Sequence, residues 1–197
     1  GVQIGSGVRT AATPRIHSQG TLSSTEKETD VAVRGEGYFR VLLPDGRTAY
    51  TRDGSFELDA KGTLVTADGW QVDPAITVPA NSSGLTVNAQ GVVQVTVGTA
   101  SAPTTIGQLQ LARFVNKSGL EAIGNNLFVE TASSGAPQVA NPGDEGYGTL
   151  LQAHLEAGNV NSVAEISDLI AAQRAYEMNS RVIRAADEMM SASVSPK

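Results

Sequence analysis

Gly35-Glu36-Gly37 begins like the glycine-rich loop that binds dinucleotide phosphates. Such a loop needs a third glycine at a fixed distance and a helix that opens behind it, because backbone N–H groups and the helix N-terminus bind the phosphates. Neither a third glycine at that distance nor a helical pattern follows. We therefore interpret these residues as a turn between strands and expect no nucleotide cofactor.

Acidic and histidine side chains offer two further kinds of chemistry, metal binding and acid–base catalysis. Asp-Gly pairs at residues 45–46, 53–54 and 68–69 lack the spacing of calcium-binding loops. His17 and His154 have no carboxylate at ligand spacing, and the chain contains no cysteine. We predict no catalytic, cofactor-binding or metal-binding residues, and hence that the protein is not an enzyme.

The composition argues against nucleic acids and membranes as binding partners. The 197 residues, 40% of them hydrophobic, suffice for one domain of good size with an extension. With 14 basic and 20 acidic residues the net charge is −6, and no basic cluster indicates nucleic-acid binding. No apolar run approaches the roughly 18 residues that span a bilayer, so we expect no direct membrane insertion.

The residue pattern in the central part of the chain is typical of a β domain. Glycines recur at residues 46, 54, 62 and 69, and the Asp-Gly pairs among them favour tight hairpin turns because both residue types tolerate positive φ. β-Branched and aromatic runs lie between these turns. The expected strands are residues 31–33, 38–43, 48–51, 55–58, 63–66, 76–78, 85–87, 92–97, 107–114 and 127–130.

Three zones follow from these patterns. Residues 1–30 are expected to be extended, with a short strand near residues 15–17. Residues 31–145 form the β domain, an antiparallel meander or sandwich-like arrangement. Residues 146–197 contain a link with one strand-like run and a long terminal helix. The predicted fold class is therefore mainly β with a long C-terminal α-helix of coiled-coil type.

The terminal helix is expected over about residues 162–194. Ser162 and Glu165 have the spacing of a capping box at its start, and Pro196 closes the run. No glycine or proline interrupts the residues between. At about 1.5 Å per residue, the helix would be on the order of 50 Å long.

Two apolar seams run along this predicted helix. Leu169, Tyr176, Ile183 and Met190 recur every seven residues, and a second seam rich in alanine alternates steps of four and three on another side. A surface helix usually has one apolar stripe, so we expect this helix to pack on helices outside the β domain. The predicted assembly residues are Leu169, Ile170, Ala175, Tyr176, Met178, Val182, Ile183, Met189 and Met190.

Two long motifs resemble the flagellar axial proteins, the family of rod, hook and hook-associated subunits. Residues 30–41 and 49–59 are similar to the family's central block, and residues 158–165 and 170–180 resemble its terminal helix motif. The motif residues are Gly35, Gly37, Tyr38, Phe39, Tyr50, Arg52, Gly54, Phe56, Asn159, Asn161, Gln173, Arg174 and Tyr176. Residues 1–10, 14–16, 107–112 and 130–137 look most like the members that form the distal rod.

The resemblance implies a structural subunit of the distal rod, which self-assembles into a helical tube and transmits torque through the cell envelope. It implies contacts with other rod proteins, the hook protein and the surrounding ring proteins of the envelope. It places the protein in the periplasmic part of the basal body, crossing to the outer membrane, after export by the flagellar type III machinery without a cleaved signal peptide.

Two features depart from the family pattern. Residues 25–30 are more charged than usual, and the family's N-terminal helix, which pairs with the C-terminal one, is expected to be missing from this chain. Two alternatives remain open at this point: another flagellar rod or hook subunit, and a binding β module with a coiled-coil tail.

Overall fold

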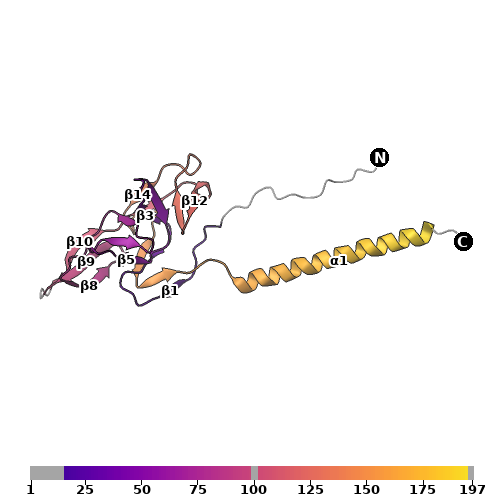
Figure 1. The fold of residues 1–197 in the computed structure, drawn as a ribbon, viewed down its shortest axis with the longest axis horizontal. Coiled ribbons are helices and arrows are strands. Elements are labelled where there is room, and N and C mark those ends of the chain that lie inside the picture. Colours follow the sequence, from indigo (N-terminus) through magenta and orange to yellow (C-terminus); the bar gives the residue numbers. More distant parts are fainter. Residues whose placement is uncertain (1–15, 99–101, 195–197) are drawn as a thin grey trace. The chain divides into compact units, whose positions relative to one another are not determined.

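The computed structural model describes residues 16–98 and 102–194. The chain divides into two compact units, residues 1–158 and residues 159–197. The first unit contains all the strands of the described residues, and the second contains the helix α1 (Ser162–Val194), as Figure 1 shows in chain order. The predicted fold class, mainly antiparallel β with one long C-terminal helix, is confirmed.

The strands of the first unit are short. They are β1 (Leu22–Ser24), β2 (Val31–Arg34), β3 (Tyr38–Leu42), β4 (Thr48–Thr51), β5 (Phe56–Leu58), β6 (Leu64–Thr66), β7 (Gln71–Asp73), β8 (Ser82–Val87), β9 (Val92–Val97), β10 (Thr104–Gln108), β11 (Leu111–Arg113), β12 (Glu121–Gly124), β13 (Leu127–Val129), β14 (Gln138–Ala140), β15 (Thr149–Gln152) and β16 (His154–Glu156), with a 3₁₀ turn η1 (Lys117–Gly119).

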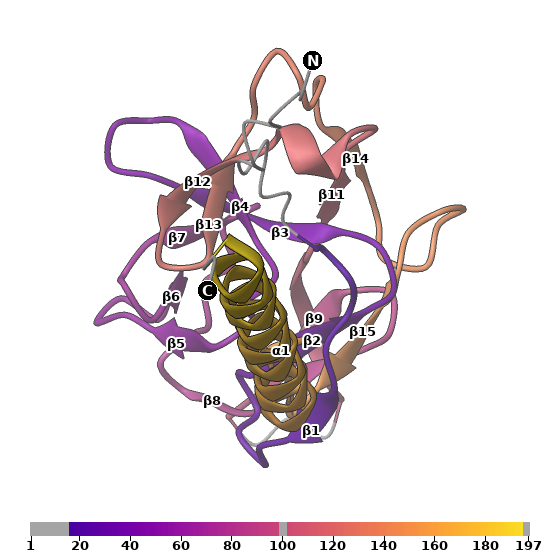
Figure 2. The same ribbon diagram turned by 90° about the vertical axis from the view of Figure 1, so that its right-hand side faces the viewer.

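The largest sheet is built around β3. Its order is β12-β13-β4-β3-β7-β6-β5, and β11 pairs with β3 and with β14. Figure 2 shows the β12–β13 hairpin beyond β4 in this sheet. A second sheet has the order β10-β9-β8, and two-stranded ladders join β2 to β15 and β1 to β16. All of these pairings are antiparallel, as short consecutive strands joined by tight turns require.

The main core lies where the two larger sheets and the β2–β15 ladder meet. Phe39, Phe56, Val33 and Leu111 are fully buried there together with Leu109. The rings of Phe39 and Phe56 meet edge to face with centroids 5.1 Å apart. A separate aromatic cluster forms on the other face of β3, where Tyr38 packs among the other rings of that face.

The predicted strand at residues 107–114 is wrong as a single element. The chain pairs with β9 along β10 and then changes partner to β3 and β14 along β11. Leu109 lies between the two strands, and its amide donates to the carbonyl of Gly91 at 2.8 Å. Alternation of apolar and polar residues continues across the change of partner, so periodicity could not reveal it.

Two more predicted strands differ from the structure. Residues 76–78 bury Ile76 and form one isolated bridge, Thr63 to Thr77, within the short segment that the prolines at 74 and 79 bound. Ile16 and His17 belong to no strand, and Arg15 lies outside the described residues; the strand of this region is β1.

The compact β unit continues past residue 145. β15 pairs with β2 over four residues, and β16 pairs with β1 over three. Ala153 separates the two strands with a φ of 56°, which turns the chain between them. The strand-like run near the end of the predicted link is therefore part of the β unit, which extends to Gly158.

Candidate assembly site and the junction of the chain ends

The helix α1 begins at an asparagine cap. The side-chain oxygen of Asn161 accepts hydrogen bonds from the amides of Val163 and Ala164 at 3.1 and 3.2 Å. Its carbonyl accepts the first helical bond, from Glu165. The predicted capping box on Ser162 and Glu165 is therefore wrong, because Asn161 occupies the N-cap position and Ser162 is already helical.

The apolar side chains of α1 are exposed. Leu169, Tyr176, Ile183 and Met190 of the first seam are 61–76% exposed, and Met178, Val182 and Met189 of the second are 66–69% exposed. Ile170 is 45% exposed, and Ala175 is exposed as well. Within its own unit the described residues provide no second helix or strand that could cover either seam.

The helix is long, but its exposed apolar residues are interrupted by charges. Arg174, Glu177, Arg181, Arg184 and Glu188 form a charged strip along one side. No helix of the described residues has the length and apolar character needed to cross a bilayer. The helical motif residues Gln173, Arg174 and Tyr176 are exposed together with this strip and the seams.

The four aromatic motif residues of the β unit pack in its interior. Phe39 and Phe56 belong to the main core, whereas Tyr38 and Tyr50 belong to the aromatic cluster, where the ring of Tyr50 lies 4.7 Å from that of Phe114. Burial raises the pKa of the Tyr38 and Tyr50 hydroxyls. These residues stabilise the fold of the β unit.

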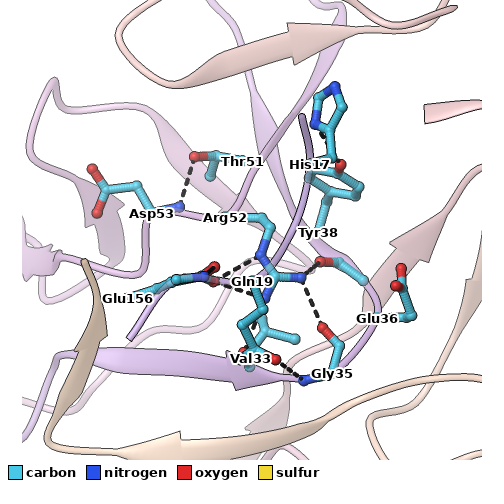
Figure 3. A network of polar contacts seen from close by, with 12 residues as sticks. His17, Gln19, Val33, Gly35, Glu36, Tyr38, Thr51, Arg52, Asp53 and Glu156 are labelled. Atoms are coloured by element: carbon cyan, nitrogen blue, oxygen red, sulfur yellow. Dashed lines mark hydrogen bonds and ion pairs between the residues drawn. The ribbon is translucent and has the colours of Figure 1, made fainter. Parts of the chain in front are cut away.

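The polar and glycine motif residues meet at a second place, around Arg52. Figure 3 shows the guanidinium of Arg52 among main-chain carbonyls at the β2–β3 turn. Nη1 donates to the carbonyls of Gly35 and Gly37 at 2.8 and 3.0 Å, and Nη2 donates to that of Val33 at 3.1 Å. Gly35 and Gly37 have φ values of 110° and 139°, which turn their carbonyls in a way that residues with a Cβ rarely adopt.

The remaining donors of Arg52 reach the strand that leads to the helix. Nε and Nη2 lie 2.8 and 2.7 Å from Oε2 of Glu156 in β16. The side chains of Arg52 and Glu156 are 22% and 11% exposed, so water screens this ion pair less than a surface pair. Glu156 balances the charge of Arg52, and the carbonyls satisfy its other N–H groups.

The same cluster holds the segment that enters the β unit. Oε1 of Glu156 accepts a hydrogen bond from the amide of Gly20 at 2.8 Å. The Gln19 side chain donates to the Val33 carbonyl at 2.9 Å and accepts from the Gly35 amide at 3.1 Å. We call the side chains of Gln19, Arg52 and Glu156 together with the amide of Gly20 the junction cluster.

Arg52 is the one member of the junction cluster that was predicted from the sequence, together with Gly35 and Gly37, whose carbonyls it binds. Gln19, Gly20 and Glu156 were not predicted. Local patterning contains no signal for Gln19 or Gly20, since their partners lie far away in the sequence. For Glu156 there was one sign. It directly follows an uncharged strand-like run, residues 149–155, and a charged residue beside such a run often has a partner.

The chain matches known families over both units. Residues 32–95 match the family described as "Flagellar hook protein FlgE/F/G D1 domain", and residues 151–195 match "Flagellar basal body rod FlgEFG protein C-terminal". The first match covers most of the β-unit motif, and the second begins within β15 and continues through β16 to the end of the helix.

Several curated relatives are similar over nearly the whole chain, all of them named "Flagellar basal-body rod protein FlgG". The relative from Caulobacter vibrioides is 52% identical over 98% of this chain and 73% of its own length. The relative from Borreliella burgdorferi is 46% identical over 96% and 72%, and that from Bacillus subtilis is 39% identical over 95% and 72%. On this similarity and the two family matches, the chain belongs to the family of flagellar basal-body rod and hook proteins.

Proposed function

We propose that the chain is a structural subunit of the flagellar rod, in its distal part, and that copies of it assemble through α1. The exposed seams of α1 carry this proposal. Burying one large apolar side chain stabilises a contact by about 1.5–3 kcal/mol. Seven such side chains, together with Ile170, expose more apolar surface than a helix without a partner normally leaves in water.

The arrangement of the seams supports a polymer in preference to a closed dimer. Two seams on different sides of a helix allow contacts with more than one neighbour at a time. A repeated contact between different faces of identical subunits does not close on itself unless its rotation happens to form a ring, and otherwise it produces a helical assembly. The predicted assembly residues Ala175 and Met178 lie on the alanine-rich seam, where small side chains allow close approach of helices.

The proposed role is mechanical and not catalytic. The names of the relatives describe basal-body rod proteins, which supports a position in the basal body. We further propose contacts with other rod proteins, with the hook protein and with the envelope rings, a periplasmic position crossing to the outer membrane, and export by the flagellar type III machinery without a cleaved signal peptide.

A hook subunit is the second candidate function. The description of the family matched by residues 32–95 names the hook protein, which favours this possibility. The relatives with the rod name, similar over almost the whole chain, favour the rod. Locating a tagged full-length chain in isolated hook–basal bodies separates the two: a rod subunit is found within the basal body, and a hook subunit outside it.

The proposal is tested by placing charges on the first seam. In the double variant Leu169→Asp and Ile183→Asp, a buried helix contact would contain two unpaired carboxylates. We expect the β unit to keep its thermal unfolding transition, whereas rods fail to form in cells and tubes fail to form from purified protein in electron micrographs. Normal rods in the double variant would contradict the proposal.

A matched control uses the charged strip of the same helix. The double variant Arg181→Ala and Arg184→Ala changes the net charge by −2, as the seam variant does, but leaves both seams intact. We expect rods to form in this control. Loss of rods in both variants would indicate that net charge, and not the apolar seam, governs assembly.

A further inference from the structure

The two ends of the β unit are held side by side. β1 and β16 pair over three residues, with Leu22 opposite Glu156 and Ser24 opposite His154. The amide of Ala157 donates to the carbonyl of Thr21 at 2.8 Å. The segment before β1 and the segment that leads to α1 therefore leave the unit from one place.

This pairing is too short to fix the ends by itself. An isolated two-stranded ladder is marginally stable in water, and this one has only three pairs. Its side chains Leu22, Leu155 and His154 are half-buried, so burial of apolar surface contributes less than in the main core. Another interaction helps to hold the ladder against the rest of the β unit, beside the hydrogen bond from the amide of Ala153 to the carbonyl of Asp30 at 2.7 Å.

Arg52 and Glu156 provide that interaction. Arg52 directly follows β4 of the largest sheet, and its guanidinium donates to the carbonyls of Val33, Gly35 and Gly37 as well as to Glu156. Glu156 uses its second oxygen to accept from the amide of Gly20. One ion pair thus joins the central sheet, the β2–β3 turn, the entering segment and the departing strand.

The backbone at Gly20 leaves no space for a side chain. An ideal Cβ added to Gly20 would lie 1.8 Å from the carbonyl oxygen of Ala157. Main chain therefore lies directly against main chain where the two ends leave. Such close approach is possible only with glycine, and it aligns the Gly20 amide with the Glu156 carboxylate.

We propose that Arg52 and Glu156 are positioning residues for assembly, which clamp both chain ends to the β unit so that load on the helix passes into that unit. This inference rests on the proposed function, and it adds a mechanical role that the apolar seams do not supply. A clamp differs from a residue pair that only stabilises the fold. When the clamp opens, the core stays folded, but the two chain ends at β1 and β16 come away from the β unit.

The substitution Arg52→Lys tests the clamp while it keeps the charge. A lysine ammonium carries its three N–H donors on one nitrogen. It therefore cannot reach three carbonyls and a carboxylate at once, as the planar fork of a guanidinium does. We expect the amides of Gly20, Thr25 and Ala157 to exchange with solvent at least ~10-fold faster, which corresponds to about 1.4 kcal/mol of local opening. The core amide of Leu64 should exchange as in the wild type.

A second variant separates the clamp from an ordinary ion pair. Exchanging the charges in Arg52→Glu with Glu156→Arg restores opposite charges but places a carboxylate beside the carbonyls of Val33, Gly35 and Gly37, where it has no donor to offer. We expect no rescue of exchange protection. Full rescue would overturn the clamp and indicate simple charge pairing.

The mechanical readout is made on assembled rods. Rods of Arg52→Lys subunits should form, since the seams are intact, but should bend and twist more in electron micrographs, and cells should lose speed steeply in viscous medium. The matched control is Arg47→Lys, since Arg47 pairs with Asp45 in an exposed turn away from the junction cluster. Unchanged exchange, or wild-type rods that are no stiffer than Arg52→Lys rods, would contradict the clamp.

The two proposals fail in different ways. Wild-type protein that forms no rods contradicts the proposed function, while amide exchange still measures the clamp in the monomer. Wild-type rods together with unchanged Arg52→Lys exchange contradict the clamp and leave the proposed function standing.

Discussion

The amide of Val31 donates a 3.0 Å hydrogen bond to the carbonyl of Gly54, and the backbone of Gly54 lies so close to Val31 that an added Cβ would be 1.7 Å from the Val31 carbonyl oxygen. The Asp53-Gly54 pair was predicted to form a hairpin turn. That prediction is wrong, because β4 and β5 are not partners and Gly54 has no positive φ. A glycine is required at position 54 because the backbone of Val31 lies where a Cβ would be.

The first prediction contrasts two glycines. Gly54→Ala should destabilise the β unit by about 3 kcal/mol or more, since backbone and the neighbouring Phe39 ring must move. Gly46→Ala should cost only about 1 kcal/mol, because Gly46 has a φ of 82° but open space around it. Denaturant unfolding measures both values. Equal costs would contradict the close approach at Gly54.

The second prediction concerns the start of α1. Asn161→Ala should remove the cap and cost the helix about 1 kcal/mol, so that the amides of Val163 and Ala164 exchange faster. Ser162→Ala should leave both amides nearly unchanged, since Ser162 lies within the first turn. A larger effect from Ser162→Ala would favour the capping box over the asparagine cap.

The third prediction is a dependence of stability on pH at the β5–β6 turn. Hydrogen bonds from the amides of Thr63 and Lys61 hold the pKa of Asp59 below its ordinary value of 3.8. A lowered folded pKa means that the ionised group stabilises the fold above pH 3.8 and loses this contribution as the pH falls through the folded pKa.

The variant Asp59→Asn isolates this effect. Wild type should be more stable than Asp59→Asn at about pH 6, and the difference should shrink as the pH falls toward about 2. Thermal unfolding midpoints across this range provide the measurement. A difference that stays constant with pH would show that the charge of Asp59 has no role in the turn.

Much of the fold could be predicted from local patterns. The helix over residues 162–194 was predicted because the run contains no glycine or proline, and the structure confirms its extent. Strands β2 to β6 follow β-branched and aromatic runs separated by turn residues, and the hairpin turns at Gly46 and Gly69 have the positive φ that their Asp-Gly pairs suggest.

The elements that escaped prediction are short or depend on distant partners. β12 and β14 are three or four residues long, and β12 joins β13 through Asn125 and Asn126, whose φ values of 47° and 58° make a tight turn that an Asn-Asn pair could have signalled. Glu156 meets Arg52 across 104 residues, which no local pattern records.

Assembly through α1 requires that its apolar seams are covered in the assembled rod. The chain contains no cysteine, so a single Ile183→Cys substitution creates one reactive thiol on the first seam. Its rate of reaction with a water-soluble maleimide can be measured in purified monomer, where residue 183 is 62% exposed, and in rods isolated from cells. We expect rapid labelling of the monomer and strong protection in the rod; equal labelling rates in the two would show that the seam stays exposed in the rod.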